Sequence, residues 1–119
     1  AAETGFVLAR DPDTVRAPDV AFVAADRVSG IGDESAFVPF APDMAIEVAS
    51  PSDSFSGLEE KAFSWLNAGT RLVLLVDPAN ETVHVYRSTD DIAVLGKGDV
   101  ISASDVVDGW QVAVAKFFQ

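Results

Sequence analysis

The chain has 119 residues, a length that suits one domain with a single core; 49% of them are hydrophobic and 23% are charged. These proportions exclude a disordered chain, and the lack of cysteine excludes disulfides and thiolate metal sites. The net charge of −11, from 19 acids and 8 bases, disfavours binding to a DNA backbone unless cations or clustered bases offset it.

No segment of the sequence has the character of a membrane anchor or a secretion signal. The apolar runs are shorter than the roughly 20 residues that a membrane helix needs. The first five residues, Ala1 to Gly5, have neither the basic segment nor the apolar core of a signal peptide. We therefore expect a cytoplasmic protein that does not bind membranes, and the lack of cysteine agrees with this expectation.

The first half of the chain contains three stretches with the composition of β-strands. They are short, apolar and bounded by Pro, Gly, Ser or Asp. Pro18 suits the start of the second stretch, where a strand needs no N–H donor. The predicted strands cover residues 4–9, 16–24 and 44–49, and residues 26–40 form a connecting loop.

One helix is predicted after the third strand, over residues 54–68. An apolar stripe recurs along it at helical spacing and consists of Leu58, Ala62, Trp65 and Leu66. Ser56 and Glu59 have the spacing of a capping box at its start, whereas Ser52 or Asp53 would cap the helix one turn earlier.

The second half of the chain predicts further strands. Residues 72–76 are all apolar, as expected for a strand that is buried on both faces. Residues 82–87 alternate and predict a half-exposed antiparallel strand, residues 92–95 and 100–101 predict a hairpin, and residues 110–118 predict a last strand, or a strand and a short turn. The whole pattern predicts one α+β domain over residues 1–119, a mixed sheet with a helix packed on it.

Glu47 lies alone among the apolar residues of the third predicted strand. A buried carboxylate costs several kcal/mol unless a charge or a hydrogen bond meets it. If the second and third strands are antiparallel neighbours, the start of one lies opposite the end of the other, and Asp19 then lies beside Glu47. Asp43 is too far away to bind the same ion, since it lies roughly 13 Å from Glu47 along the strand.

Two carboxylates at this position would form a site for a hard cation. Asp19, Glu47, the carbonyl oxygen of Val48 and water molecules make an oxygen site that suits Mg²⁺ or Mn²⁺. Such an ion activates water and offsets the charge of a phosphoryl group. Lys61, one to two turns into the predicted helix, can position the attacking water.

Six blocks of sequence, in a specific order and spacing, carry a family resemblance: residues 18–23, 41–53, 60–61, 68–71, 76–78 and 83–87. From Arg16 onward the chain resembles the Uma family of restriction-endonuclease-like proteins, a branch of the PD-(D/E)XK phosphodiesterase superfamily. The resemblance implies that fold, and Mg²⁺-dependent cleavage of DNA. It makes Asp19 the motif aspartate and Glu47 the second motif acid. The motif lysine falls at Ala49, so the resemblance points to Lys61 in its place.

Family members carry a longer N-terminal region with a helix that covers the sheet. We therefore expect that an upstream segment is missing, lies elsewhere, or is replaced by a second copy of the chain. The alternative function is a catalytically inactive nuclease fold that acts as a homo-oligomeric interaction module, such as a dimer. The charge of −11 and the absence of lysine at residue 49 favour it.

Each proposed site residue also has a simpler interpretation. Asp19 can end a turn after Pro18. Glu47 can form a buried ion pair with Lys61 or Arg71, and Lys61 can be an ordinary solvated helix residue. The single histidine, at position 84, suits a surface strand, and the aromatic residues suit the core or an interface. The bases expected near the cleft are Arg10, Arg16, Lys61 and Arg71.

Overall fold

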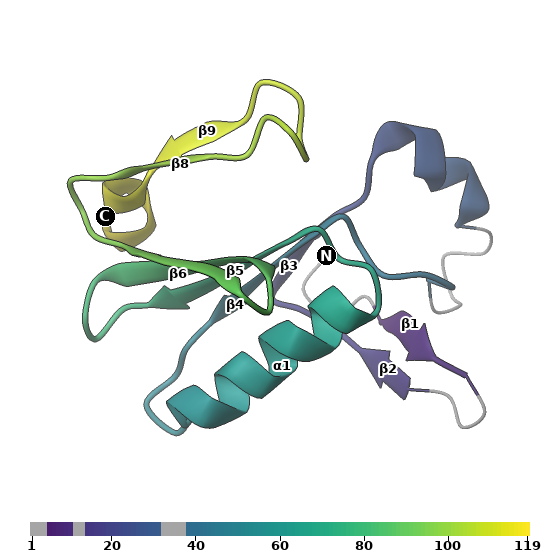
Figure 1. Cartoon of the computed structure of the whole chain (residues 1–119), viewed down its shortest axis with the longest axis horizontal. Helices are drawn as coiled ribbons and strands as arrows, with labels where there is room; N and C mark the ends of the chain where they lie inside the picture. Colours follow the sequence, from purple (N-terminus) through teal and green to yellow (C-terminus); the bar gives the residue numbers. More distant parts are fainter. Residues whose placement is uncertain (1–4, 11–13, 32–37) are drawn as a thin grey trace.

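The computed structural model describes residues 5–10, 14–31 and 38–119 (Figure 1). Its centre is a five-stranded sheet in the order β3-β4-β5-β6-β7. The strands are β3 (Val20–Phe22), β4 (Met44–Val48), β5 (Leu72–Asp77), β6 (Thr82–Ser88) and β7 (Asp91–Leu95). β4 and β5 are parallel and the other neighbouring pairs are antiparallel. The predicted mixed sheet is confirmed.

The helix α1 (Phe55–Asn67) connects the parallel strands β4 and β5 and covers one face of the sheet (Figure 1). Its N-cap is Ser54, whose hydroxyl accepts a hydrogen bond from the Gly57 N–H at 3.1 Å. The capping box predicted from Ser56 and Glu59 is therefore wrong. Glu59 instead accepts a hydrogen bond from the Tyr86 hydroxyl at 2.7 Å, which ties the helix to β6.

Each face of the sheet has its own hydrophobic core, because successive side chains of a strand point to opposite faces. On the α1 face, Trp65 packs with alternate residues of the central strands, including Val73 and Leu75. On the other face, Leu72, Leu74 and Val76 pack against the C-terminal part of the chain. That part consists of β8 (Val100–Ser102), β9 (Gln111–Ala113) and the 3-10 helix η2 (Val114–Phe118). β5 is buried on both faces, as its sequence predicts.

Two predicted strands divide or pair differently in the structure. The predicted strand at 16–24 is two strands, since β2 (Thr14–Arg16) pairs with β1 (Phe6–Ala9) and β3 begins only after Pro18. A proline has no N–H, so it suits the break between the two ladders. The hairpin predicted over residues 92–101 is wrong, because β7 pairs with β6 whereas β8 pairs with β9.

A short 3-10 helix, η1 (Ala25–Gly30), follows β3 and lies within the predicted loop. Within the described ranges, no helix has the length and apolar character that crossing a membrane requires.

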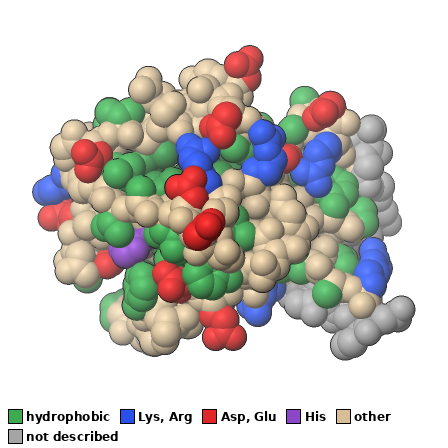
Figure 2. All heavy atoms as spheres, viewed as in Figure 1, with side chains coloured by type: hydrophobic (Ala, Val, Ile, Leu, Met, Phe, Trp, Pro, Cys, Tyr) green, Lys and Arg blue, Asp and Glu red, His purple; other side chains and the backbone are tan. Residues whose placement is uncertain are grey.

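Acidic and basic side chains are interspersed on the face shown in Figure 2 rather than gathered in one basic field. Ion pairs with acids occupy five bases of the described chain: Arg27, Lys61, Arg71, Arg87 and Lys97.

Candidate functional site

Glu47 is the fourth residue of β4 and points to the face of the sheet that α1 covers. It is only 5% exposed. Its Oε2 lies 3.6 Å from Nζ of Lys61, a residue of the second turn of α1. Its Oε1 is buried and makes no hydrogen bond within the part of the chain that the structure describes. One oxygen of this carboxylate is thus paired with a cation and the other is available to bind a ligand.

Asp19 lies where β3 begins, directly beside the end of β4. The pairing of Val20 with Ile46 confirms that the two predicted strands are antiparallel neighbours. At Val48, β3 offers no backbone partner to β4. The side chain of Asp19 takes this place, because its Oδ2 accepts a hydrogen bond from the Val48 N–H at 2.7 Å. The N–H and C=O of one strand residue point to the same side. The carbonyl oxygen of Val48 therefore faces the side of β4 on which Asp19 lies.

The environment of Glu47 holds the pKa of its carboxyl above the usual value. Burial is the main cause, because it penalises the charged form. The nearby Asp19 carboxylate raises the pKa further, whereas the Lys61 ammonium lowers it. The lysine therefore offsets part of the cost of this buried charge, and a bound cation would offset more.

A cavity of about 200 Å³ opens beside these residues and is lined by Arg16, Ala17, Glu47, Lys61 and Trp65. Three polar side-chain atoms of its lining are buried and have no hydrogen-bond partner among the described residues: Nε of Arg16, Oε1 of Glu47 and Nε1 of Trp65. A buried polar group without a partner costs about 1–3 kcal/mol. This concentration of unpaired groups indicates that the cavity suits a polar ligand.

The donor set fits a metal ion that keeps part of its water shell. Asp19, Glu47 and the Val48 carbonyl offer oxygen atoms, which hard cations prefer. In residues 5–10, 14–31 and 38–119, no group of three or more His, Cys, Asp or Glu side chains is placed to hold an ion. Mg²⁺ commonly binds one or two carboxylates and several waters.

Asp43 is the second buried acid next to β4, and it lies at the opposite end of that strand. Its Oδ1 is 2.8 Å from Nη1 of Arg27 and 3.9 Å from Nη1 of Arg71, and its Oδ2 accepts the Ala24 N–H at 2.7 Å. Asp43 therefore lies outside the site of Glu47, in agreement with the distance that the sequence predicts between them. Asp43 is the centre of a structural ion-pair network.

The bases expected near the cleft are divided between several places. Arg16 and Lys61 line the cavity beside Glu47. Arg10 lines a separate cavity together with Arg27, and Arg71 is bound to Asp43. The sequence predicts that Trp65 lies in the core or an interface, and it is 1% exposed. No sequence pattern indicates that Trp65 also lines the cavity with a buried, unpaired indole N–H.

Comparison with known proteins agrees with the fold and with the family resemblance. The sequence matches the Uma2 family, described as "Putative restriction endonuclease", over residues 1–115. A crystal structure of a "putative nuclease belonging to DUF820" from Anabaena variabilis superposes with a TM-score of 0.71 at 24% identity.

The superposition covers 90% of this chain but only 62% of that protein, so this chain spans less than two thirds of its length. At this identity the likeness shows the fold alone. No curated protein matches the chain. The family match extends over nearly the whole sequence and the sheet has the fold of the DUF820 structure; the chain therefore belongs to the Uma2 family.

Proposed function

We propose that this domain is a metal-dependent nuclease that hydrolyses DNA phosphodiester bonds. The observation that carries the proposal is the buried carboxylate of Glu47, which has one unpaired oxygen beside Asp19 and faces the ammonium of Lys61. Membership of a family described as "Putative restriction endonuclease" supports this reaction class, and the oxygen donors support Mg²⁺ or Mn²⁺ as the ion.

Three residues would hold the ion. Asp19 contributes its Oδ1, because its Oδ2 accepts the Val48 N–H, and Glu47 contributes its Oε1. The carbonyl oxygen of Val48 supplies a third ligand from the same edge of β4. When bound, Mg²⁺ lowers the pKa of a coordinated water and neutralises charge on the phosphoryl oxygens.

Lys61 and Arg16 would handle the water and the phosphate. Lys61 is 46% exposed at its side chain and has three N–H donors, so it can bind Glu47 and still donate to a water or phosphate oxygen. Arg16 places an unpaired Nε–H in the same cavity, where it can neutralise a phosphate oxygen. These two bases give a local positive charge on a chain whose net charge is −11.

Calorimetric titration with Mg²⁺ and Mn²⁺ tests this proposal. We expect saturable binding to the wild type and none to Asp19→Asn, which removes the charge but keeps an oxygen that can accept the Val48 N–H. The matched control is Asp105→Asn, which changes an acid that is 63% exposed and should bind metal normally. Absence of binding in the wild type, or unchanged binding in Asp19→Asn, would contradict the metal site.

Cleavage of supercoiled plasmid, of short duplexes and of single-stranded oligonucleotides then tests the reaction itself. We expect cleavage of at least one of these by the wild type in Mg²⁺, and none in EDTA or with Asp19→Asn. Metal binding by a wild type that cleaves none of the three DNA substrates would refute nuclease activity while keeping the metal site.

The edge strand β7 supports the second candidate, a homo-oligomeric interaction module. β7 pairs only with β6 in the described sheet, and Ile92 and Val94 on it are 40% and 58% exposed. An open, apolar sheet edge can pair with the same edge of a second copy. Light scattering should then show a dimer for the wild type and a monomer for Val94→Lys; a monomeric wild type would refute this candidate.

A further inference from the structure

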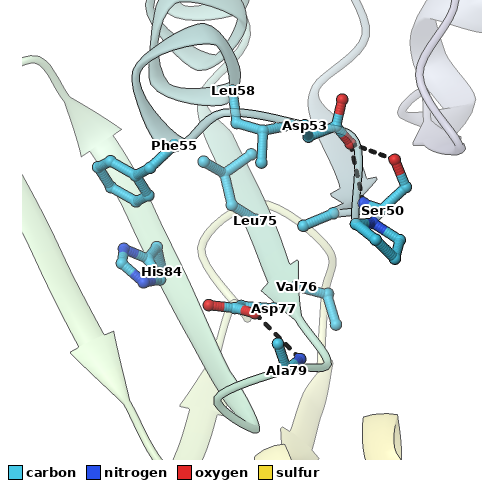
Figure 3. Close-up of a pocket in the computed structure, with 11 residues that line it drawn as sticks. Ser50, Asp53, Phe55, Leu58, Leu75, Val76, Asp77, Ala79 and His84 are labelled. Carbon is cyan, nitrogen blue, oxygen red and sulfur yellow. Dashed lines mark hydrogen bonds between the residues drawn. The ribbon is translucent and has the colours of Figure 1, made fainter.

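A second pocket lies beyond the carboxyl ends of the parallel strands β4 and β5, next to the start of α1 (Figure 3). Its volume is about 220 Å³. Its lining comes from the segment that follows Glu47 in the chain, from the first turn of α1, and from β5 and β6. Ligands of sheets with parallel strands commonly bind at this end of the strands.

One wall of this pocket is aromatic and its floor is apolar. The rings of Phe55 and His84 lie side by side, with centroids 5.1 Å apart and planes at 51° (Figure 3). Phe55 is 51% exposed although it is a large apolar residue. Leu58 and Leu75 form the floor between this wall and the opposite side of the pocket. An exposed ring above an apolar floor suits a flat ligand that stacks.

The opposite side carries hydrogen-bond acceptors with negative charge. The backbone N–H and the hydroxyl of Ser50 both donate to Oδ2 of Asp53, at 2.8 and 3.0 Å, which leaves Oδ1 able to accept from a ligand. Asp77 also lines the pocket, close to His84 (Figure 3); its Oδ1 accepts the Ala79 N–H at 3.1 Å and its Oδ2 accepts the Asn80 side-chain N–H at 2.8 Å. These hydrogen bonds, first those from Ser50 and from the Asn80 side chain, lower the pKa of both carboxyls.

Two carboxylates select against a phosphate and in favour of an amino group. A phosphate would be repelled by both charges, whereas the exocyclic amino group of adenine, cytosine or guanine donates hydrogen bonds that a carboxylate accepts. A nucleobase also has the flat apolar faces that the Phe55 and His84 wall can contact. Its size suits this pocket, which is smaller than the pockets that bind drug-sized ligands.

The edge of the pocket lies about one nucleotide spacing from the proposed cleavage site. Ala49, at its edge, follows Glu47 by two residues and points to the same face of the sheet, about 7 Å further along the chain. A phosphate held beside Glu47 and Lys61 can therefore belong to a strand whose neighbouring base reaches the pocket.

We propose that this pocket binds one unpaired base with an exocyclic amino group (adenine, cytosine or guanine) of the nucleic-acid strand whose phosphate lies beside Glu47. The inference rests on the proposed nuclease function and names its substrate class: a strand with a base outside the double helix, either single-stranded or with a base that has left the stack. The base stacks on the ring of Phe55, and its amino group donates a hydrogen bond to the carboxylate of Asp53.

The test is an NMR titration of the metal-free protein in EDTA with deoxyadenosine, deoxycytidine and thymidine. These probes contain no phosphate, and the experiment needs no metal and no cleavage. We expect saturable shifts confined to the pocket. The two amino-bearing nucleosides should bind about tenfold more tightly than thymidine, because the N3–H of thymidine lies between two carbonyl oxygens that a carboxylate repels, and thymidine has no amino group. Failure here leaves metal binding and cleavage intact, and failure of cleavage leaves this titration interpretable.

Matched variants locate the binding to the aromatic wall. Phe55→Ala should weaken deoxyadenosine binding at least about tenfold, because it removes the stacking surface, and Phe55→Tyr should restore it. Val100→Ala changes an equally exposed residue on β8, across the sheet, and should bind normally. The proposal is overturned by shifts outside the pocket, by equal affinity for thymidine, or by wild-type binding in Phe55→Ala.

Discussion

The carboxylate of Asp19 accepts the Val48 N–H at 2.7 Å, in the place where β3 would have to continue to pair with β4. The hydrogen bond satisfies a backbone donor that has no strand partner on that side. It also orients the carboxylate and leaves Oδ1 without this hydrogen bond. The backbone of β4 therefore determines which oxygen of Asp19 would bind the proposed ion.

Replacement of Glu47 by glutamine should remove metal binding and keep the fold. Glu47→Gln has nearly the same volume and removes a charge whose burial is costly. A ligand that binds only the folded state raises its stability, so Mg²⁺ should raise the melting temperature of the wild type but not of Glu47→Gln. Glu60→Gln, an exposed acid on α1, is the control. A variant that unfolds while metal affinity is unaffected would make Glu47 a structural acid.

A decrease in pH should raise the free energy of unfolding of the wild type relative to that of Glu47→Gln. The pKa of Glu47 is raised above its ordinary value of 4.5, mainly by burial, so the folded state binds its proton more tightly than the unfolded state. The resulting stabilisation is fully present below the unfolded pKa and is lost as the pH rises through the folded pKa. Urea unfolding of both proteins at pH values from neutral to 4.5 measures the difference between their free energies of unfolding. This difference should grow in favour of the wild type as the pH falls, and a constant difference would contradict the prediction.

The proton that binds the carboxylate of Glu47 should compete with the metal ion. Since the ion binds the carboxylate form, metal affinity should fall as the pH decreases, with a midpoint above 4.5. Calorimetric titrations at several pH values measure this midpoint. A midpoint at or below the ordinary value would show that another group controls binding.

Replacement of Lys61 by methionine should separate catalysis from metal binding. Lys61→Met keeps the side-chain length but removes the cation that lies 3.6 Å from Glu47. We expect metal affinity to stay equal or increase, because a competing cation is gone, and the cleavage rate to fall about 100-fold or more. Lys116→Met, on η2, should change neither quantity. Loss of metal binding in Lys61→Met would contradict this division of roles.

Asp43 should be essential for stability and not for metal binding. Asp43→Ala removes the partner of Arg27 and leaves the Ala24 N–H without its acceptor, so the free energy of unfolding should fall by about 2–4 kcal/mol. Asp105→Ala breaks a more exposed ion pair with Arg87 and should cost less than about 1 kcal/mol. Urea unfolding measures both, and equal losses would contradict the importance of burial.

The elements with a strong local pattern could be predicted from the sequence. The continuous apolar run of β5 and the helical stripe of α1 predict the ends of both elements to within one or two residues. The pairing of β3 with β4, and with it the closeness of Asp19 to Glu47, followed from the positions of the two acids along their strands. These features depend on short segments and on one assumption about strand direction.

The features that could not be predicted depend on contacts between distant segments. Asp43 and Glu47 have similar sequence surroundings, but Arg27 approaches only Asp43, because η1 lies at that end of β4. The turn after β7 has the residues of a hairpin, yet the strand that follows pairs with β9 on the other face of the sheet. Local turn signals do not specify which partner a strand will find.

The buried acids Asp43 and Glu47, at the two ends of β4, have a consequence for how this family can evolve. One end of a five-residue strand carries the ion pairs that hold the chain together, and the other end carries the group assigned to chemistry. Under the proposed function, a single substitution at Glu47 would therefore silence the protein and spare its architecture. A lineage that loses the reaction would keep an intact scaffold, free to be selected for another use.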